Sequence, residues 1–213
     1  MKANRNLDLR LYVITDRTLV GKRSLIEIIK QAIEGGTSII QLRDKTLDDD
    51  EMATLGKNIM VLTNGKIPLM VNNRVNVALA IEAQGIHVGQ DDMPAKQVRK
   101  IVGNTMILGV SANTVSEAKK AELEGADYIG AGPVFQTFTK VDADPVIGLQ
   151  GLMNIKKSVS IPIVGIGGIS SKNAKDVIKI ADGIAVISAV MAAKDPQKET
   201  QQLLKIINTF KKN

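Results

Sequence analysis

Two cations and an amide follow one another at the end of an apolar run near residue 40. Gln41, Arg43 and Lys45 stand at alternate positions, so they share one face if the segment is extended. On an inward face they would form a clamp for a diphosphate, with the planar guanidinium of Arg43 as its bidentate member. The alternative is a solvated strand end that is paired with Asp44. We favour the clamp because the residues before it are strongly apolar.

Oxygen-bearing side chains follow the next two apolar runs. Asn72 and Asn73 end the first run, and Asp92 follows the second. Amide and carboxylate oxygens that converge on one rim are typical of a Mg²⁺ site rather than a zinc site. The alternative is that Asn73 and Asp92 cap the helices after them. Both interpretations stay open, and the nearby cationic clamp favours the metal.

Two apolar runs near the C-terminus end in small residues and then open a helix. They lie in the segments 161–171 (IPIVGIGGISS) and 182–188 (DGIAVIS). Such an arrangement presents backbone N–H groups to an anion at a helix N-terminus. In a (β/α)8 barrel the phosphate site forms after strands seven and eight. The pattern therefore predicts a phosphate on the amides of Gly168 and Ser188.

A long segment without predicted structure, Pro133–Ile147, is expected to be a lid. Within it Thr137, Thr139 and Lys140 offer two hydroxyls and an ammonium to phosphate oxygens, although an ordinary polar loop has the same composition. The single histidine, His87, lies on an apolar run and is expected to be a packed residue rather than a base. The site is thus built to hold two phosphorylated groups and a divalent cation, with little apparatus for acid–base chemistry.

Strands and helices must position these residues. The sequence predicts eight strands that alternate with eight helices. The expected strands are Leu11–Thr15, Ser38–Arg43, Ile67–Asn72, Gly85–Val88, Met106–Ser111, Tyr128–Gly132, Ile161–Gly165 and Gly183–Ser188. The expected helices are Leu25–Glu34, Asp49–Leu62, Arg74–Ala83, Ala95–Val102, Val115–Glu124, Gly148–Lys157, Asn173–Ile180 and Gln197–Phe210. Strict alternation without a linker predicts a single α/β domain over residues 1–213, a (β/α)8 TIM barrel with a parallel sheet covered by helices.

Composition restricts the class of protein. The chain has 213 residues, 44% of them hydrophobic, which is enough for one sizeable core. It has no cysteine, which excludes disulfides and thiolate chemistry and leads us to expect a cytoplasmic protein. No membrane span or signal peptide is expected. The net charge is +6, but aromatic residues make up only 2%, which favours small anionic substrates over nucleic acid.

Taken together, the motifs at the strand ends resemble those of the thiamine phosphate synthase family over nearly the whole chain. The matching stretches are 12–16 (YVITD), 41–45 (QLRDK), Asn72 with 74–75 (RV), 86–90 (IHVGQ) with 92–94 (DMP), 109–111 (GVS), 132–135 (GPVF) with Thr137 and 139–140 (TK), 165–169 (GIGGI) and 186–188 (VIS). Enzymes of this family join an aminopyrimidine-methyl diphosphate to a thiazole phosphate, which gives thiamine phosphate and pyrophosphate.

The resemblance implies two groups of substrate-binding residues. The pyrimidine diphosphate would be held by Gln41, Leu42, Arg43, Asp44, Lys45, Asn72, Ser111 and Lys140. The thiazole phosphate would be held by Thr137, Thr139, Gly168, Ile187 and Ser188, with Phe138 in the same segment. Arg43, Lys45 and Lys140 would stabilise the leaving group. Asn73 and Asp92 would hold Mg²⁺ as the cofactor.

The chain departs from the family pattern at three positions. The family has Asp, a Mg²⁺ ligand, where this chain has Asn73. Asp91 replaces a small hydroxyl residue and is a candidate to restore the charge. Asn113 stands where many relatives have His.

The second choice of function is a related isomerase, the thiazole tautomerase. That enzyme relies on a His near the position of Asn113 and tends to lack the clamp, whereas this chain has the clamp and no such His. A non-catalytic binder of thiamine precursors, suggested only by Asn73, is the third. The sequence carries no indication of oligomeric state.

Overall fold

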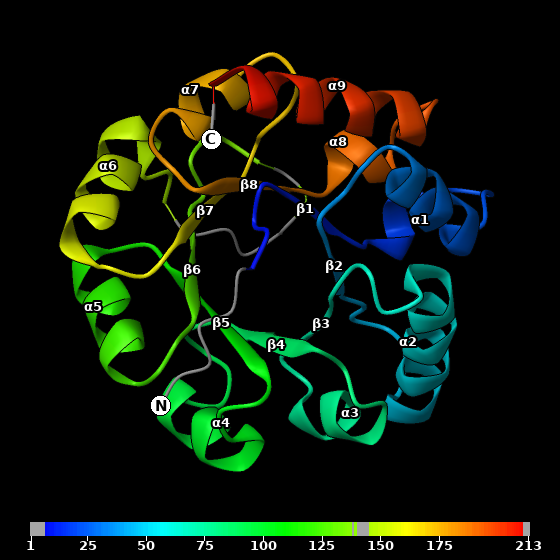
Figure 1. Cartoon of the computed structure of the whole chain (residues 1–213), viewed down its shortest axis with the longest axis horizontal. Helices are drawn as coiled ribbons and strands as arrows, with labels where there is room; N and C mark the ends of the chain where they lie inside the picture. Colours follow the sequence, from blue (N-terminus) through cyan, green and yellow to red (C-terminus); the bar gives the residue numbers. More distant parts are fainter. Residues whose placement is uncertain (1–6, 138, 140–144, 211–213) are drawn as a thin grey trace.

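Eight parallel strands close into a barrel surrounded by helices in the computed structural model, which describes residues 7–137, 139 and 145–210 (Figure 1). The strands are β1 Leu11–Ile14, β2 Ile39–Leu42, β3 Leu69–Asn72, β4 Gly85–Val88, β5 Ile107–Ala112, β6 Tyr128–Ala131, β7 Ile163–Ile166 and β8 Gly183–Val186. Each strand pairs with its neighbours in sequence, and β1 also pairs with β8. The predicted (β/α)8 architecture is therefore confirmed.

Helices cover the outside of the barrel (Figure 1). They are α1 Leu25–Glu34, α2 Asp49–Thr63, α3 Val75–Ala80, α4 Ala95–Val102, α5 Val115–Leu123, α6 Gly148–Ser158, α7 Ala174–Ile178, α8 Ser188–Met191 and α9 Pro196–Phe210, with the 3₁₀ helix η1 at Arg17–Leu19. Capping boxes begin α2, at Asp48 and Glu51, and α5, at Thr114 and Glu117. In the described part of the chain no helix has both the length and the apolarity needed to cross a membrane.

The sequence did not predict α8 or η1. The last strand was expected to continue to Ser188, but it ends at Val186. Ile187 leaves the extended conformation, with φ −117° and ψ −82°, and Ser188 begins α8. η1 forms because the carboxylate of Asp16 accepts hydrogen bonds from the backbone N–H and the hydroxyl of Thr18.

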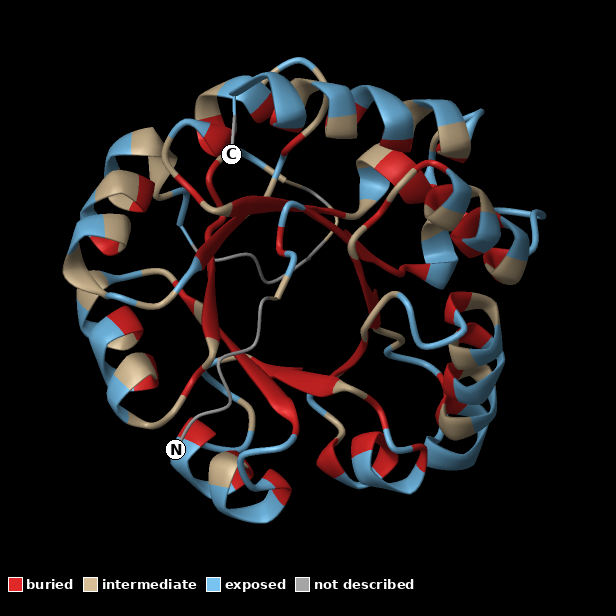
Figure 2. Ribbon diagram, viewed as in Figure 1, coloured by how far each residue is buried: buried red, intermediate tan, exposed pale blue. Residues whose placement is uncertain are grey.

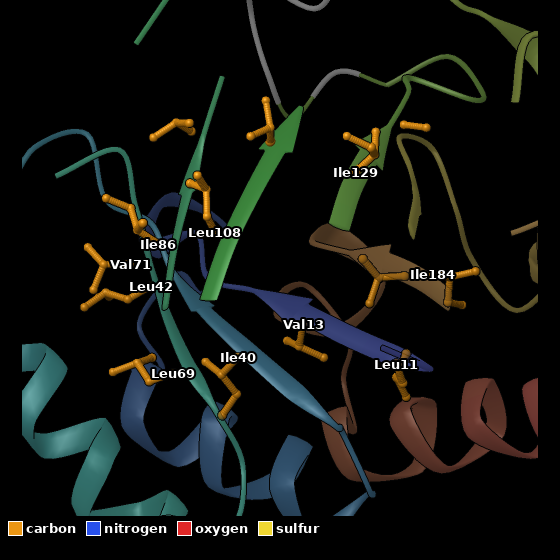
Figure 3. Close-up of a cluster of buried hydrophobic side chains, with 14 of the residues drawn as sticks. Leu11, Val13, Ile40, Leu42, Leu69, Val71, Ile86, Leu108, Ile129 and Ile184 are labelled. Atoms are coloured by element: carbon orange, nitrogen blue, oxygen red, sulfur yellow. The ribbon is translucent and has the colours of Figure 1, made fainter. Parts of the chain in front are cut away.

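Successive strand residues alternate between two buried layers. One layer lies between the strands and the helices and includes Leu11, Val13, Ile40 and Leu42 (Figure 3). The other layer fills the barrel and includes Tyr12, Ile14, Ile39, Met70, Ile107, Tyr128, Val164 and Ala185. Both faces of the strands are therefore buried, whereas each helix buries only one side (Figure 2). This explains why the strands appear in the sequence as continuous apolar runs.

Candidate active site

The carboxyl end of β2 brings the amide and the first cation of the predicted clamp to the barrel mouth. The side chain of Gln41 lies in the barrel interior and is only 3% exposed. Thr15 fixes the next inward position, because its hydroxyl accepts a hydrogen bond from Arg43 N at 2.9 Å and donates one to Arg43 O at 3.0 Å. The carboxylate of Asp16 lies 3.9 Å from the Arg43 guanidinium. The end of β1 thus orients the end of β2.

Lys45, the second cation of the predicted clamp, lies beyond the end of β2 and is exposed. Among the described residues no carboxylate forms an ion pair with its ammonium. Its ammonium is therefore not paired with a described carboxylate, which leaves it able to bind an anion as the clamp requires.

Leu42 and Asp44 do not share this orientation. Leu42 is fully buried in the layer between the strands and the helices, so only its backbone faces the mouth. Asp44 binds its own loop, because one oxygen accepts from Thr46 and Leu47 and the other pairs with Arg17 Nε at 3.0 Å. Burial tends to raise the pKa of Asp44, but the hydrogen bonds from Thr46 and Leu47 and the charge of Arg17 outweigh it and lower the pKa. The side chain of Asp44 thus shapes the clamp loop.

A row of buried polar side chains crosses the barrel below the mouth. Gln41 Nε2 donates to the hydroxyl of Tyr12 at 2.8 Å, and this hydroxyl lies 2.9 Å from that of Tyr128. The Tyr128 hydroxyl lies 2.9 Å from His87 Nδ1, and His87 Nε2 lies 2.9 Å from Ser111 Oγ. Burial lowers the pKa of His87 to about 4 and raises the pKa of both tyrosines. The row is therefore uncharged near neutral pH, and His87 is a packed, hydrogen-bonded residue as expected.

The ends of β3 and β4 bring the two predicted metal ligands together. Asn73 Nδ2 donates to Asp92 Oδ1 at 3.0 Å, and Gly89 N donates to Asp92 Oδ2 at 2.7 Å. The capping alternative is wrong for both residues. Arg74 and Pro94 occupy the N-cap positions of α3 and α4, and neither position has a side-chain cap.

This pair of side chains fits a magnesium ion in part. An amide oxygen and a carboxylate are hard ligands that suit Mg²⁺, provided that Asn73 turns its amide so that Oδ1 faces the ion. Within the described ranges no third carboxylate or imidazole joins them to form a metal cluster. Asp91 is exposed. The protein thus offers two ligands, and the remaining positions fall to substrate oxygens and water.

Asn72 completes this side of the mouth at the last residue of β3. Its side chain is partly exposed and makes no hydrogen bond to any described residue. It lies opposite His87 in the β3–β4 pair, next to the buried row. Its amide is therefore free for a ligand.

Free backbone N–H groups lie at the ends of β7 and β8, where the phosphate was predicted. The N–H groups of Gly168 and Ser188 make no hydrogen bond to any residue in the described part of the chain. The carbonyl of Gly168 accepts from Asn173 Nδ2 at 2.9 Å, which holds the turn in place. Ser188 is exposed and shares a surface depression with Ser170 of the β7 loop, and Ile187 beside it is partly buried.

The segment after β6 lies against the β7 loop. Val134 N donates to Ile166 O at 2.8 Å, and Phe135 N donates to Gly167 O at 3.1 Å. Gly168 has φ +63°, and a Cβ there would lie 2.4 Å from the carbonyl oxygen of Gln136. Only glycine permits this approach.

This contact brings the predicted hydroxyl ligands toward the free amides. Thr137 directly follows the residue that touches Gly168, and its hydroxyl accepts from Thr139 N at 3.4 Å. The two threonines are partly exposed. Phe138 and Lys140, which were predicted to bind substrate, lie outside the described residues.

Sequence reasoning missed the residues that position Arg43 and the residues that link Gln41 to Ser111. Thr15, Asp16, Tyr12 and Tyr128 were not predicted as site residues. An available signal was that Tyr12 and Tyr128 are the only two tyrosines and both lie within apolar strands. A buried phenol needs a hydrogen-bond partner, which points to a polar network inside the barrel.

Comparison with known proteins shows the family to which this fold belongs. Residues 11–190 match the thiamine monophosphate synthase family. The chain belongs to this family. It is 45% identical over 207 residues to a thiamine-phosphate synthase of Clostridium tetani, with 96% of this chain and 99% of the relative covered. A thiamine-phosphate synthase of Roseiflexus castenholzii is 50% identical over 195 residues, with 91% and 86% covered.

Solved structures give the same family and also show how widely the fold is shared. A thiamine phosphate pyrophosphorylase from Pyrococcus furiosus superposes with a TM-score of 0.88 at 46% identity, covering 96% of this chain and 98% of that one. A 3-hexulose-6-phosphate synthase from Salmonella typhimurium has a TM-score of 0.74 at only 16% identity, with 95% and 100% covered. The second likeness concerns the fold alone.

Proposed function

We propose that this chain condenses 4-amino-2-methyl-5-(diphosphooxymethyl)pyrimidine with a thiazole phosphate to give thiamine phosphate and pyrophosphate. Membership of the family supports the activity, because relatives with the synthase name match nearly the whole chain. The observation that carries the proposal is the pairing of two anion sites on one rim. Arg43 and Lys45 form the first site, and the free amides of Gly168 and Ser188 form the second.

The pyrimidine diphosphate would bind across β2, β3 and β5. Arg43, Lys45 and Lys140 would neutralise the diphosphate, while Gln41, Asn72 and Ser111 would contact the pyrimidine. Leu42 and Asp44 would contribute backbone only, because their side chains are directed elsewhere. The thiazole phosphate would bind Gly168, Ile187 and Ser188, with Thr137, Phe138 and Thr139 closing over it.

The main requirement of the reaction is departure of the diphosphate anion, and proton transfer is less important. The bond between the methylene carbon and the diphosphate oxygen breaks, and its electron pair leaves with the diphosphate. The electron-rich aminopyrimidine carries the resulting positive charge until the thiazole nitrogen donates its lone pair to the same carbon. Preorganised cations at the departing oxygens stabilise this transition state. Holding the two substrates in line supplies much of the remaining acceleration. No base is required.

Magnesium would be held between Asn73, Asp92 and the diphosphate. A bound Mg²⁺ would supply further neutralisation of the charge that develops on the leaving group. The direct contribution of the chain is the orientation of these oxygens, because Gly89 N already fixes one oxygen of Asp92. Weak binding to the free protein is expected, since only one carboxylate is present.

A turnover assay with both substrates and Mg²⁺ tests the proposal. We expect thiamine phosphate and pyrophosphate in equal amounts, and no thiamine phosphate when the thiazole phosphate is omitted. A tautomerase would instead isomerise a thiazole carboxylate without releasing pyrophosphate. That alternative is disfavoured, because Asn113 takes the place of the histidine on which the tautomerase relies. A non-catalytic binder would bind both compounds without turnover.

A further inference from the structure

The buried polar row joins two groups that the proposed function assigns to the substrate. Gln41 and Ser111 are its ends, and Tyr12, Tyr128 and His87 lie between them. Five different strands supply these side chains, so the row crosses the barrel rather than following one strand. The three middle residues have no role in the proposed chemistry.

The barrel makes room for this row with two glycines. A Cβ on Gly109 would lie 2.2 Å from Tyr128 Cζ and 2.4 Å from His87 Nδ1. A Cβ on Gly130 would lie 3.0 Å from His87 Cε1. Any side chain at Gly109 would therefore displace both rings. The row thus depends on inward-facing strand positions that carry no side chain.

The orientation of the Gln41 amide implies one direction for the hydrogen bonds of the row. Gln41 Nε2 donates to the Tyr12 hydroxyl, so the proton of Tyr12 is directed to its other partner, Tyr128. The Tyr128 proton is then directed to His87 Nδ1. A neutral imidazole has one donor and one acceptor nitrogen, so His87 Nε2 carries the proton and donates to Ser111 Oγ.

This direction determines what each end presents to a ligand. Gln41 Oε1 has no hydrogen-bond partner among the described residues. Every fully buried side-chain nitrogen or oxygen in this part of the chain does have a hydrogen-bond partner. Gln41 Oε1 is therefore not fully buried, and it is open to the mouth. It presents an acceptor. Ser111 is partly exposed and already accepts from His87, so its hydroxyl proton is free. It presents a donor.

We propose that Tyr12, Tyr128 and His87 act as a directional relay that holds Gln41 as an acceptor and Ser111 as a donor, and that the relay selects an aminopyrimidine over its 4-oxo analogue. The inference rests on the proposed function and names the specificity of that site. The three middle residues are positioning residues. The amino group donates to Gln41, whereas an oxo group would face a second acceptor and leave both without a proton.

The relay also makes it energetically costly for Gln41 to turn its amide so that it could bind the 4-oxo analogue. Turning the Gln41 amide would direct its oxygen toward Tyr12, whose proton must then leave Tyr128. The change propagates through Tyr128 to the tautomer of His87 and the proton of Ser111. A site whose polar groups are fixed in this way rejects an analogue that lacks the matching donor.

The first test is the tautomer of the single histidine, which needs no substrate. Nitrogen-15 NMR of the histidine-labelled protein contains signals from His87 alone. We expect a neutral ring with Nε2 protonated and Nδ1 bare. A ring protonated at Nδ1 in the wild type would overturn the relay.

The second test compares dissociation constants for the aminopyrimidine diphosphate and its 4-oxo analogue by calorimetry. Wild type should prefer the amino compound, and Tyr12→Phe should reduce this preference about tenfold, the worth of one hydrogen bond of about 1.4 kcal/mol. Thr37→Val is the matched control, because the Thr37 hydroxyl is buried and, within the described part of the chain, donates only to the backbone carbonyls of Leu11 and Ile39. It should leave the preference unchanged.

The outcomes separate the relay from the proposed function. An equal loss for both compounds in Tyr12→Phe would mean that the phenol is only structural, and an unchanged preference would exclude the relay. If the wild type binds neither compound, the proposed function fails, whereas the histidine tautomer still decides the direction of the row.

Discussion

We expect departure of the diphosphate to depend most on Arg43. Its guanidinium is held near Asp16, and its backbone is fixed by Thr15. Arg43→Ala should lower kcat/KM by two to three orders of magnitude, about 3–4 kcal/mol of transition-state stabilisation. Steady-state kinetics measure this loss. The control is Arg10→Ala, which also removes an arginine with a carboxylate partner, Asp8, at an exposed position. Near-normal kcat/KM in folded Arg43→Ala would refute this role.

Asn73 stands where the family resemblance leads us to expect an aspartate. Asn73→Asp places a second carboxylate against Asp92 Oδ1, where the amide now donates at 3.0 Å. We expect a lower melting temperature without Mg²⁺, because like charges repel, and a lower Mg²⁺ concentration for half-maximal activity. Thermal melts and activity at increasing Mg²⁺ measure both effects.

Two further variants decide which carboxylate holds the metal. Asp92→Ala should abolish activity at ordinary Mg²⁺, whereas Asp91→Ala should change little, because Asp91 is exposed and lies outside the Asn73–Asp92 contact. Equal damage from both would make Asp91 the compensating ligand. An unchanged Mg²⁺ requirement in Asp92→Ala would exclude the metal site.

At the scale of the elements, the β7 loop and the segment after β6 pack together and form the proposed phosphate site as one unit. Gly168→Val requires a side chain at φ +63° and pushes against Gln136 O. We expect weaker binding of the thiazole phosphate and much less effect on the pyrimidine diphosphate, measured by calorimetry. Gly103→Val is a matched control, because Gly103 has φ +62° and a Cβ there would meet nothing within 4 Å. Equal losses for both substrates would place the phosphate elsewhere.

At the scale of the whole molecule, the buried row makes stability depend on pH. His87 is neutral in the fold, with its pKa lowered from 6.5 to about 4 by burial. Below pH 6.5 the unfolded chain binds a proton on His87 that the folded chain does not bind. The free energy of unfolding therefore decreases as the pH is lowered from 6.5 to about 4. The slope is about 1.4 kcal/mol per pH unit for one group.

Urea unfolding across this pH range measures the effect. His87→Gln is the control, since it removes the titrating group and should flatten the curve above the range where carboxylates titrate. The same slope in His87→Gln would assign the pH dependence to other groups.

The sequence by itself determined the barrel and predicted a site at the carboxyl ends of its strands. Alternating apolar runs and amphipathic segments are local patterns, and a parallel strand followed by a helix has few ways to pack. The strand-end residues Gln41, Arg43, Gly168 and Ser188 were predictable for the same reason, because the fold collects all carboxyl ends of the strands on one rim. Two short elements, η1 and α8, were missed because a few hydrogen bonds and backbone dihedral angles determine whether such short helices form.

Only the tertiary structure decided which of these side chains meet. The contact of Asn73 with Asp92, the outward direction of Leu42 and the hydrogen bonds from the loop to Asp44 depend on the register and tilt of neighbouring strands. The row from Gln41 to Ser111 depends on them most. Its bonds join residues 29 to 116 positions apart, except the step from His87 to Ser111 at 24. No local pattern encodes such distances, because closure of the barrel brings the side chains together.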